Sequence, residues 1–258
     1  MAIKGARHIL ALKQRKSRDE QKKYLIEGIR LCEEAIASNA PIEQFLFCRE
    51  SIDRNERLDA LFQNTVEKKI PIQQTDWRAF KGMSDTETPQ GVLGVVKMPT
   101  WDRDAVLQST NPILILDRIS DPGNLGMIMR TAEAASCAGI FLTPGSVELF
   151  NAKVVRSTMG AIFRLPVFAG ENGINLIQEL TQRNIPILAA HTDGTPYHQL
   201  TQKGPVALLL GNEAFGVDPD LLAQATQTVT IPMASPVESL NVAVASGILL
   251  YKLQELSL

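Results

Sequence analysis

The chain has 258 residues, of which 45% are hydrophobic and 21% charged, and its formal net charge is −2. This length suits one large globular domain or two unequal ones, and the longest apolar runs, such as Pro112–Leu116, are far too short to span a bilayer. Three cysteines, Cys32, Cys48 and Cys137, form no Cys-x-x-Cys pair, which argues against a disulfide framework and a zinc site. The N-terminus shows no signal-peptide core, and together with the unpaired cysteines this predicts a cytoplasmic protein. The short apolar runs and the cysteine pattern lead us to expect neither a membrane partner nor a metal.

The charge is unevenly distributed along the chain. Residues 1–23 carry eight basic and two acidic side chains, a local charge of +6, which leaves −8 on the rest. A positive arm on an otherwise acidic protein is a candidate contact for the phosphates of a nucleic acid. A solvated helix face explains the same charges equally well.

Residues 1–98 are predicted to form a smaller N-terminal domain, and residues 99–110, which show no periodicity, are predicted to form a linker. Apolar residues recur at helical spacing after residue 22, and Asn39-Ala40-Pro41 provides a stop for that helix. The turn-like Thr88-Pro89-Gln90-Gly91 precedes a β-branched run. The expected elements are a helix over Lys22–Asn39, a strand over Gln44–Cys48, a helix over Ser51–Lys69 and a strand over Val92–Val96.

Residues 111–258 alternate predicted strands with predicted helices. The strands are expected at Ile113–Leu116, Gly139–Thr143, Ile185–Ala189, Val206–Leu210 and Thr228–Ile231, and the helices at Gly123–Cys137, Asn151–Ala161, Ile174–Arg183 and Ser239–Glu255. Such alternation predicts an α/β fold with a parallel sheet that helices cover on both faces. Ligands of such sheets collect at the carboxyl ends of the strands, which directs attention to the loops there.

The first of these loops runs from Asp117 into the helix that carries Arg130. Gly123 and Gly126 permit a tight turn with exposed backbone N–H groups, and Arg130 lies one to two turns into the helix. The alternative interpretation is a plain glycine-containing connection with a surface arginine.

The second loop is Leu210–Gly216, in which paired glycines and Glu213 follow an apolar strand. The loop lacks the Gly-Lys-Ser/Thr of a phosphate-binding P-loop and the Gly-x-Gly-x-x-Gly of dinucleotide binding, which disfavours a nucleotide-dependent dehydrogenase. By itself, the loop is equally compatible with a structural turn.

The third loop enters the last helix. Ser239 is a suitable N-cap residue, which would place Asn241 in the first turn of that helix. A serine nucleophile needs a histidine base, and His8, His191 and His198 have no clear acidic partner in the sequence. Hydrolase chemistry is therefore disfavoured.

Taken together, the three loops contain Asn-Leu-Gly…Arg-Thr-Ala, Gly-Asn-Glu-x-x-Gly and Ile-Pro-Met…Ser-Leu-Asn-Val-x-Val-Ala. In this order and spacing the chain resembles the SpoU-type RNA ribose 2′-O-methyltransferases of the SPOUT superfamily. The resemblance covers essentially the whole chain: Arg156–Val167 is similar to the family's mid-domain signature, and Tyr24–Gly28 and Thr88–Val92 to its ribosomal-protein-like substrate-binding domain. Ala214 departs from the family, which more often has glycine there, and matters only if this position needs a positive φ.

The resemblance implies that residues 111–258 form a knotted methyltransferase domain, with a trefoil knot whose loops hold S-adenosylmethionine in a bent shape. It implies cofactor contacts at Gly211, Ile231 and Leu240, with Thr192 as a further candidate. It also implies a homodimer that pairs through the C-terminal domains, with each active site drawing on both subunits.

The resemblance further implies that Arg130 is the principal catalytic residue, with Asn124, Glu213, Ser239 and Asn241 around it. A guanidinium group stays protonated at ordinary pH, so Arg130 is a poor free base. We expect it to hold the adjacent phosphate and polarise the ribose hydroxyl, while Glu213 orients Arg130 or another donor. Because methyl transfer from a sulfonium needs alignment and proton removal, no metal is required.

The positive arm then becomes an expected RNA-binding element, and other cations are expected to extend it toward the active site. Large-subunit ribosomal RNA is the expected substrate, because an N-terminal domain of this kind is typical of the family's rRNA-directed members. A tRNA 2′-O-methyltransferase and a non-catalytic RNA-binding or ribosome-assembly factor are the alternatives. The candidate RNA contacts are Lys13, Arg15, Lys16, Arg18 and Arg156, with Lys153 and Arg164 as extensions.

Overall fold

The computed structural model describes residues 6–257, which fall into two compact units. The first unit extends to Thr100 and also includes Phe150–Phe163, whereas the second contains Trp101–Leu149 and the chain from Arg164 onward. Phe150–Phe163 lies within the predicted C-terminal domain, yet it packs in the first unit, where the rings of Phe150 and Tyr24 lie 4.6 Å apart. The two units are therefore not simply consecutive segments of the chain.

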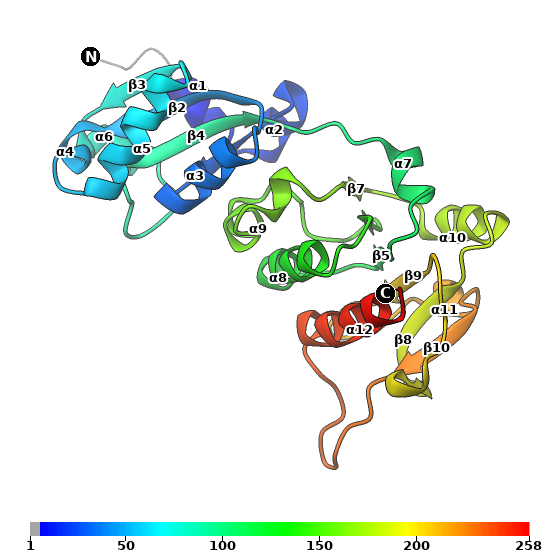
Figure 1. The fold of residues 1–258 in the computed structure, drawn as a ribbon. Coiled ribbons are helices and arrows are strands. Elements are labelled where there is room, and N and C mark those ends of the chain that lie inside the picture. Colours follow the sequence, from blue (N-terminus) through cyan, green and yellow to red (C-terminus); the bar gives the residue numbers. More distant parts are fainter. Residues whose placement is uncertain (1–5, 258) are drawn as a thin grey trace. The chain divides into compact units, whose positions relative to one another are not determined.

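The first unit contains a four-stranded sheet in the order β1-β4-β2-β3. Strands β2, β3 and β4 of this sheet are labelled in Figure 1. The β2–β3 pair is parallel, and β4 pairs antiparallel with both β1 and β2. Helices α1 and α6 pack on one sheet face against Leu46 and Leu93, whereas α5 covers the other face, where Phe62 contacts Phe47 at 5.2 Å. The strands are β1 (Lys23–Glu27), β2 (Ile42–Cys48), β3 (Ile72–Thr75) and β4 (Val92–Lys97), and the helices are α1 (Ala6–Ala11), α2 (Arg15–Gln21), α3 (Ile29–Ala37), α4 (Arg49–Ile52), α5 (Glu56–Glu67), α6 (Trp77–Met83) and α9 (Ala152–Ser157).

The helix predicted over residues 22–39 is wrong in its first part, because β1 occupies Lys23–Glu27 and α3 begins only at Ile29. In β1, buried Tyr24 and Ile26 alternate with less buried neighbours, which is the period of a strand. Gly28 then adopts a φ of +104°, so the strand ends and the chain turns before α3 begins. Leu25 matched the helical spacing only by coincidence.

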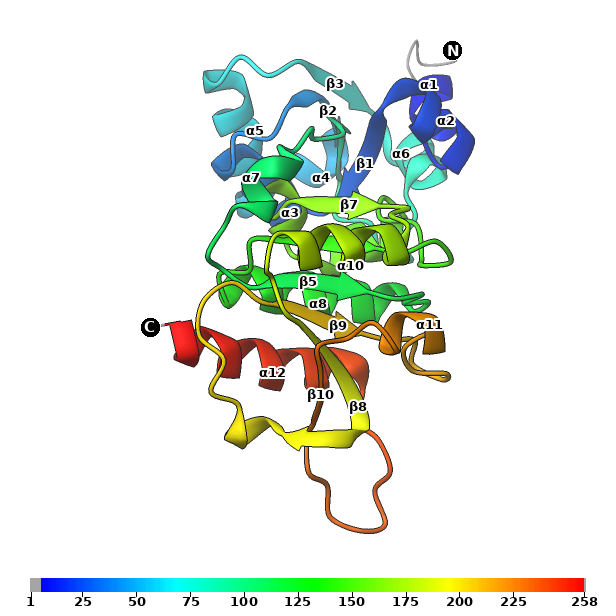
Figure 2. The same ribbon diagram turned by 90° about the vertical axis from the view of Figure 1, so that its right-hand side faces the viewer.

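The second unit contains a six-stranded, all-parallel sheet in the order β10-β8-β9-β5-β6-β7. Helices α7, α10 and α11 contribute to the core on one face, and α8 packs with α12 on the other (Figure 2). The predicted α/β class and parallel-sheet domain are thus confirmed, whereas the knot stays a prediction. The strands are β5 (Ile113–Leu116), β6 (Gly139–Leu142), β7 (Val167–Ala169), β8 (Ile187–Pro196), β9 (Ala207–Leu210) and β10 (Gln227–Thr230), and the helices are α7 (Arg103–Leu107), α8 (Pro122–Ala134), α10 (Gly173–Gln182), α11 (Pro219–Leu222) and α12 (Val242–Ser257).

The apolar runs of this unit form its central strands. Every residue of β5, β6 and β9 is buried, as expected of parallel strands that helices cover on both faces. Within residues 6–257, no helix is long and apolar enough to cross a membrane.

Two predicted segments need correction. The expected linker over residues 99–110 contains α7, because the Asp102 carboxylate accepts a hydrogen bond from Ala105 N at 3.1 Å and so caps a short helix. The last helix begins at Val242 rather than at Ser239. Its cap is Asn241, whose Oδ1 accepts hydrogen bonds from Ala243 N at 2.9 Å and Val244 N at 3.4 Å.

Candidate active site

A cavity of about 590 Å³ opens in the second unit beside the carboxyl ends of β9 and β10. Its walls bring together the four predicted cofactor residues with Glu213 and Ser239 from the predicted catalytic set. The four cofactor candidates are Gly211, Ile231, Leu240 and Thr192. The fold thus brings together cofactor candidates that are up to 48 residues apart in the sequence, as expected for loops at one edge of a parallel sheet.

The loop over residues 211–217 forms one wall, and its backbone is folded tightly on itself. Asn212 and Gly216 exchange two backbone hydrogen bonds of 2.9 Å each. A Cβ atom on Gly211 would lie only 2.1 Å from backbone atoms of Gly216 and Val217, so only glycine fits there. Ala214, where the family more often has glycine, does not adopt a positive φ, so this departure causes no backbone strain.

The side chain of Asn212 holds this loop in place. Its Oδ1 accepts hydrogen bonds from Ala214 N at 2.9 Å and Phe215 N at 3.2 Å, and its Nδ2 donates to the Arg118 carbonyl at 2.7 Å. The Phe215 side chain at the tip is 83% exposed and also lines the cavity. Asn212 therefore anchors the second loop to the first.

Three of the predicted catalytic residues form one hydrogen-bonded chain. Asn124 Nδ2 donates to Glu213 Oε1 at 3.0 Å, and Asn241 Nδ2 donates to Asn124 Oδ1 at 2.9 Å. Because Asn241 also caps α12, the chain links the loop at Glu213 to the first turns of α8 and α12. The three sequence motifs thus meet at this chain of side chains.

Glu213 has more hydrogen-bond donors than Asn124 alone. Ser120 donates to its Oε2 from N at 3.2 Å and from Oγ at 3.0 Å, and Asp121 N donates to Oε1 at 3.2 Å. Partial burial opposes ionisation, but the donors from Asn124, Ser120 and Asp121 outweigh it and lower the pKa of the Glu213 carboxyl. The carboxylate therefore orients Asn124 and the 120–121 turn, and it makes no contact with Arg130.

Arg130 stands apart from this chain. Its side chain is exposed on α8, it does not line the cavity, and it makes no hydrogen bond or ion pair with any residue in the described range 6–257. Ser239 lines the cavity but is not the helix cap. The chain of hydrogen bonds therefore joins three of the five predicted catalytic residues, Asn124, Glu213 and Asn241. Arg130 and Ser239 lie outside it.

Asp117, which was not among the predicted site residues, links the first loop to the second. Its side chain is almost fully buried and accepts hydrogen bonds from Thr143 Oγ1 at 2.8 Å and Asp218 N at 2.9 Å. Arg118 Nη2 forms an ion pair with it at 3.0 Å. A carboxylate directly after the apolar strand Ile113–Leu116 is the sequence signal that could have identified it, since a charge at such a place needs partners.

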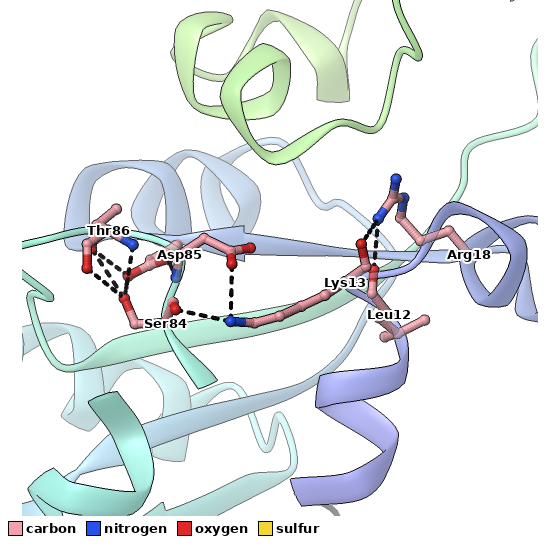
Figure 3. Close-up of polar contacts among 7 residues, drawn as sticks. Leu12, Lys13, Arg18, Ser84, Asp85 and Thr86 are labelled. Atoms are coloured by element: carbon pink, nitrogen blue, oxygen red, sulfur yellow. Dashed lines mark hydrogen bonds and ion pairs between the residues drawn. The ribbon is translucent and has the colours of Figure 1, made fainter. Parts of the chain in front are cut away.

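Two of the predicted RNA contacts are engaged within the protein (Figure 3). Arg18 is buried, and its Nη1 donates to the carbonyl oxygens of Leu12 at 2.9 Å and Lys13 at 2.8 Å. Lys13 Nζ pairs with Asp85 at 2.9 Å and donates to the Ser84 carbonyl at 2.9 Å. These contacts indicate that both side chains brace the N-terminal helices.

The remaining candidates differ in their exposure. Arg15 and Lys16 are exposed on α2 and have only ion pairs one turn away. Arg156 is half-buried and makes no hydrogen bond or ion pair with the residues that the structure describes. Lys153 is exposed, and Arg164 is held by the carboxylate of Glu133. Within the described chain, no cluster of His, Cys, Asp and Glu side chains is suited to a metal ion.

Two family models match the chain. The model of the SpoU rRNA Methylase family matches residues 111–251, and the model of the MRM3-like substrate binding domain matches residues 4–94. The first match covers more than half of the chain and includes every residue that lines the cavity.

The chain is also similar to individual methyltransferases over nearly its full length. The 23S rRNA (guanosine(2553)-2'-O)-methyltransferase RlmP of Bacillus subtilis is 34% identical over 94% of this chain and 93% of its own. The human mitochondrial rRNA methyltransferase 3 is 28% identical over 93% of this chain and 69% of its own. The crystal structure of an AdoMet-bound rRNA methyltransferase from Sinorhizobium meliloti superposes with a TM-score of 0.84 at 28% identity, over 99% of this chain and 95% of that one.

Proposed function

The chain belongs to the SpoU rRNA methylase family, and on this basis we propose that it transfers a methyl group from S-adenosylmethionine to a ribose 2′-hydroxyl of large-subunit (23S) rRNA. The observation that carries the proposal is the cavity of about 590 Å³, whose walls combine the cofactor candidates Gly211, Ile231 and Leu240 with Glu213 and Ser239. The name of the Bacillus relative and the bound AdoMet of the Sinorhizobium structure support the same activity.

The lining of the cavity suits this cofactor. Its volume lies within the range of small-molecule sites, and its walls offer apolar side chains such as Leu210, Val229 and Met233 beside the backbone of the loop over residues 211–217. This mixture fits an adenine ring and a short aliphatic chain, with Thr192 as a polar group on the wall. When bound, S-adenosylmethionine supplies a methyl group on a positively charged sulfur that departs as a neutral thioether.

The hydrogen-bonded chain of Glu213, Asn124 and Asn241 is suited to hold the ribose. Each of the three side chains makes at least two hydrogen bonds, so an amide edge can be presented to a ribose hydroxyl without much loss of side-chain freedom. We assign Ser239, which lines the cavity, to the same positioning task. Glu213 acts through Asn124 and the 120–121 turn and is therefore a positioning residue.

Arg130 is proposed to hold the phosphate next to the methylated nucleotide and to polarise the 2′-hydroxyl. Since it has no partner in the described part of its own chain, we propose that it completes the active site of a second subunit in a homodimer. The exposed apolar side chains on α8 and α12 support such pairing: Met127 is 44% exposed, Val244 52% and Tyr251 52%. A cytoplasmic location is part of the same proposal, because the described cysteines are all free and buried.

The test of this proposal is transfer of tritiated methyl groups from S-adenosylmethionine to separate pools of large ribosomal RNA, tRNA and total RNA. Arg130→Ala should lower turnover roughly 100-fold or more, and it should leave cofactor binding to the single chain unchanged because Arg130 does not line the cavity. Arg130→Lys should rescue little, because lysine cannot supply the planar fork of the guanidinium group.

Label in the ribosomal RNA that survives base hydrolysis as a resistant dinucleotide establishes 2′-O-methylation of that RNA. Label in tRNA alone would support the tRNA alternative. Cofactor binding without any label would favour a non-catalytic RNA-binding or assembly factor, and near-full turnover of Arg130→Lys would contradict the assigned role of Arg130.

A further inference from the structure

The first unit has a hollow of about 550 Å³ that the proposed methyl transfer does not use. It lies between the short helix α4, the start of α6 and the turn before β4, and Trp77, Glu50, Arg54 and Gln90 line it. An exposed indole, a carboxylate and a cation thus line one hollow. The volume is sufficient for a nucleotide.

Trp77 presents an aromatic platform at this hollow. The side chain is 40% exposed although it is the first residue of α6, and its ring lies nearly parallel to that of buried Phe80, at an interplanar angle of 12° and a centroid distance of 6.5 Å. Asp76 fixes the start of the helix by accepting a hydrogen bond from Ala79 N at 2.8 Å. Exposed aromatic rings on rigid elements are the surfaces on which unpaired RNA bases stack.

Glu50 supplies a hydrogen-bond acceptor beside that platform. Its Oε1 accepts from Trp77 N and its Oε2 from Cys48 Sγ, each at 3.3 Å, so the carboxylate is held next to the tryptophan. Hydrogen bonds from its own backbone N–H, from Cys48 and from Trp77 N lower the pKa of the Glu50 carboxyl, which keeps it ionised. An ionised carboxylate only accepts hydrogen bonds, so it selects a base edge that carries donors.

A second hollow of about 460 Å³ adjoins the first through Gln90, which lines both. Arg30 and Arg156 line this second hollow, and neither makes a hydrogen bond or ion pair with any described residue. Gln90 Oε1 accepts from Ile29 N at 2.9 Å, which ties the shared wall to the start of α3. Two guanidinium groups in the hollow that adjoins the one with Trp77 suit the phosphates that flank a stacked base.

We propose that these adjoining hollows bind an unpaired guanine nucleotide of RNA, with the base stacked on Trp77, its N1–H and N2–H groups donating to Glu50, and the flanking phosphates held by Arg30 and Arg156. Guanine is the base whose Watson–Crick edge offers two adjacent donors to one carboxylate. The inference rests on the proposed function in taking RNA as the partner, and it adds a base-selective contact to the substrate-binding unit.

Intrinsic fluorescence tests the stacking directly. The chain has two tryptophans, so Trp101→Phe leaves Trp77 as the only one. Short unstructured oligouridines that carry one guanosine should quench this fluorescence, and replacing guanosine by adenosine should weaken binding roughly 10-fold. Inosine, which lacks the N2 amino group, should fall between the two.

Variants then assign the contacts, with binding measured by the anisotropy of labelled oligonucleotide. Trp77→Ala should weaken binding of the guanosine oligonucleotide roughly 10-fold, and Glu50→Gln should remove most of the preference for guanosine over adenosine. Val66→Ala is the matched control, since Val66 is 49% exposed on α5 and lines neither hollow. Because these substitutions lie in the first unit, a circular dichroism spectrum and a melting temperature close to those of the parent show that each variant is folded.

Absence of quenching by all the oligonucleotides, or equal affinity for guanosine and adenosine in the parent protein, would overturn the proposal. None of these measurements requires methyl transfer. A protein that shows the guanosine preference but transfers no methyl group would contradict the proposed function alone. A protein that methylates rRNA with the same KM in the parent and in Trp77→Ala would contradict this inference alone.

Discussion

The loop over residues 211–217 and the helix α2 hold their polar side chains in different ways. In the loop, Asn212 and Glu213 bond to segments about ninety residues away in sequence, at Arg118 and Asn124. In α2, Arg18 bonds to carbonyl oxygens within six residues. Motifs that follow parallel strands meet because the ends of the strands lie at one edge of the sheet. A count of charges along the chain, in contrast, does not reveal which cations already form hydrogen bonds or ion pairs within the protein.

The largest effect is expected from Gly211→Ala. The new Cβ would lie 2.1 Å from the backbone of Gly216 and Val217, so the loop must open and this wall of the proposed cofactor cavity must move. We expect the methyl-transfer rate to fall roughly 100-fold or more, since small displacements of a positioning element have effects of this size. Initial rates and calorimetric titration with S-adenosylmethionine measure the change.

Gly216→Ala is the control in the same loop. Nothing lies within 4 Å of a Cβ at this position, but its φ of +69° would strain alanine by about 1 kcal/mol. Equal losses in the two variants would show that the close approach at Gly211 has no effect beyond that of a strained residue elsewhere in the loop.

Asp117→Asn should have the next largest effect, on stability. The amide oxygen would keep the place of Oδ2 toward the N–H of Asp218, and the NH₂ group would face Thr143 Oγ1, so the Thr143 hydroxyl would lose its acceptor and Arg118 would lose its ion-pair partner. We expect unfolding in urea to show a loss of about 2–3 kcal/mol. Asp218→Asn is the matched variant, because its 3.5 Å pair with Arg118 is more exposed, and a loss below about 1 kcal/mol is expected there.

The strands of the parallel sheet could be predicted from the sequence, whereas the partners of buried Asp117 could not. The predicted strands at Ile113–Leu116 and Val206–Leu210 coincide with β5 and β9, because a fully apolar run between turns is typical of a buried parallel strand. The convergence of Gly211, Ile231, Leu240 and Thr192 on one cavity followed from motif order and resemblance, whereas the partners of Asp117 depend on three different segments.

The prediction failed where a local pattern had two interpretations. Ser239 and Asn241 are both good cap residues, and only the packing of α12 with α8 and the bond to Asn124 select Asn241. Residues 23–27 fit a helix by spacing, but pairing with β4 makes them a strand. Tertiary partners decide such cases, and no window of sequence contains them.

A smaller effect is expected from Glu213→Gln, and it should depend on pH. The folded structure lowers the pKa of this carboxyl below its ordinary value of 4.5, so its contribution to stability is fully present above that pH and is lost as the pH falls through the folded pKa. We expect the variant to be about 1 kcal/mol less stable at neutral pH. In urea unfolding at a series of pH values, the difference between the two proteins should shrink below pH 4.5, and a difference that grows there would reverse the assigned cause.

The smallest effect concerns the cations of α2 and tests the contrast with the loop most directly. Arg15 and Lys16 are exposed, with side-chain exposures of 71% and 87%, so they are free to contact phosphates, whereas buried Arg18 is not. Replacing both Arg15 and Lys16 by alanine should reduce the slope of log affinity for rRNA fragments against log salt by roughly 1 to 2, while the melting temperature changes little.

Arg18→Ala should do the opposite, because it removes two hydrogen bonds to the carbonyl oxygens of Leu12 and Lys13 and lowers the melting temperature without a change in the salt slope. If Arg18→Ala changed the slope as much as the double variant, burial in the free protein would be a poor guide to RNA contact, and the basic arm would have to rearrange when RNA binds.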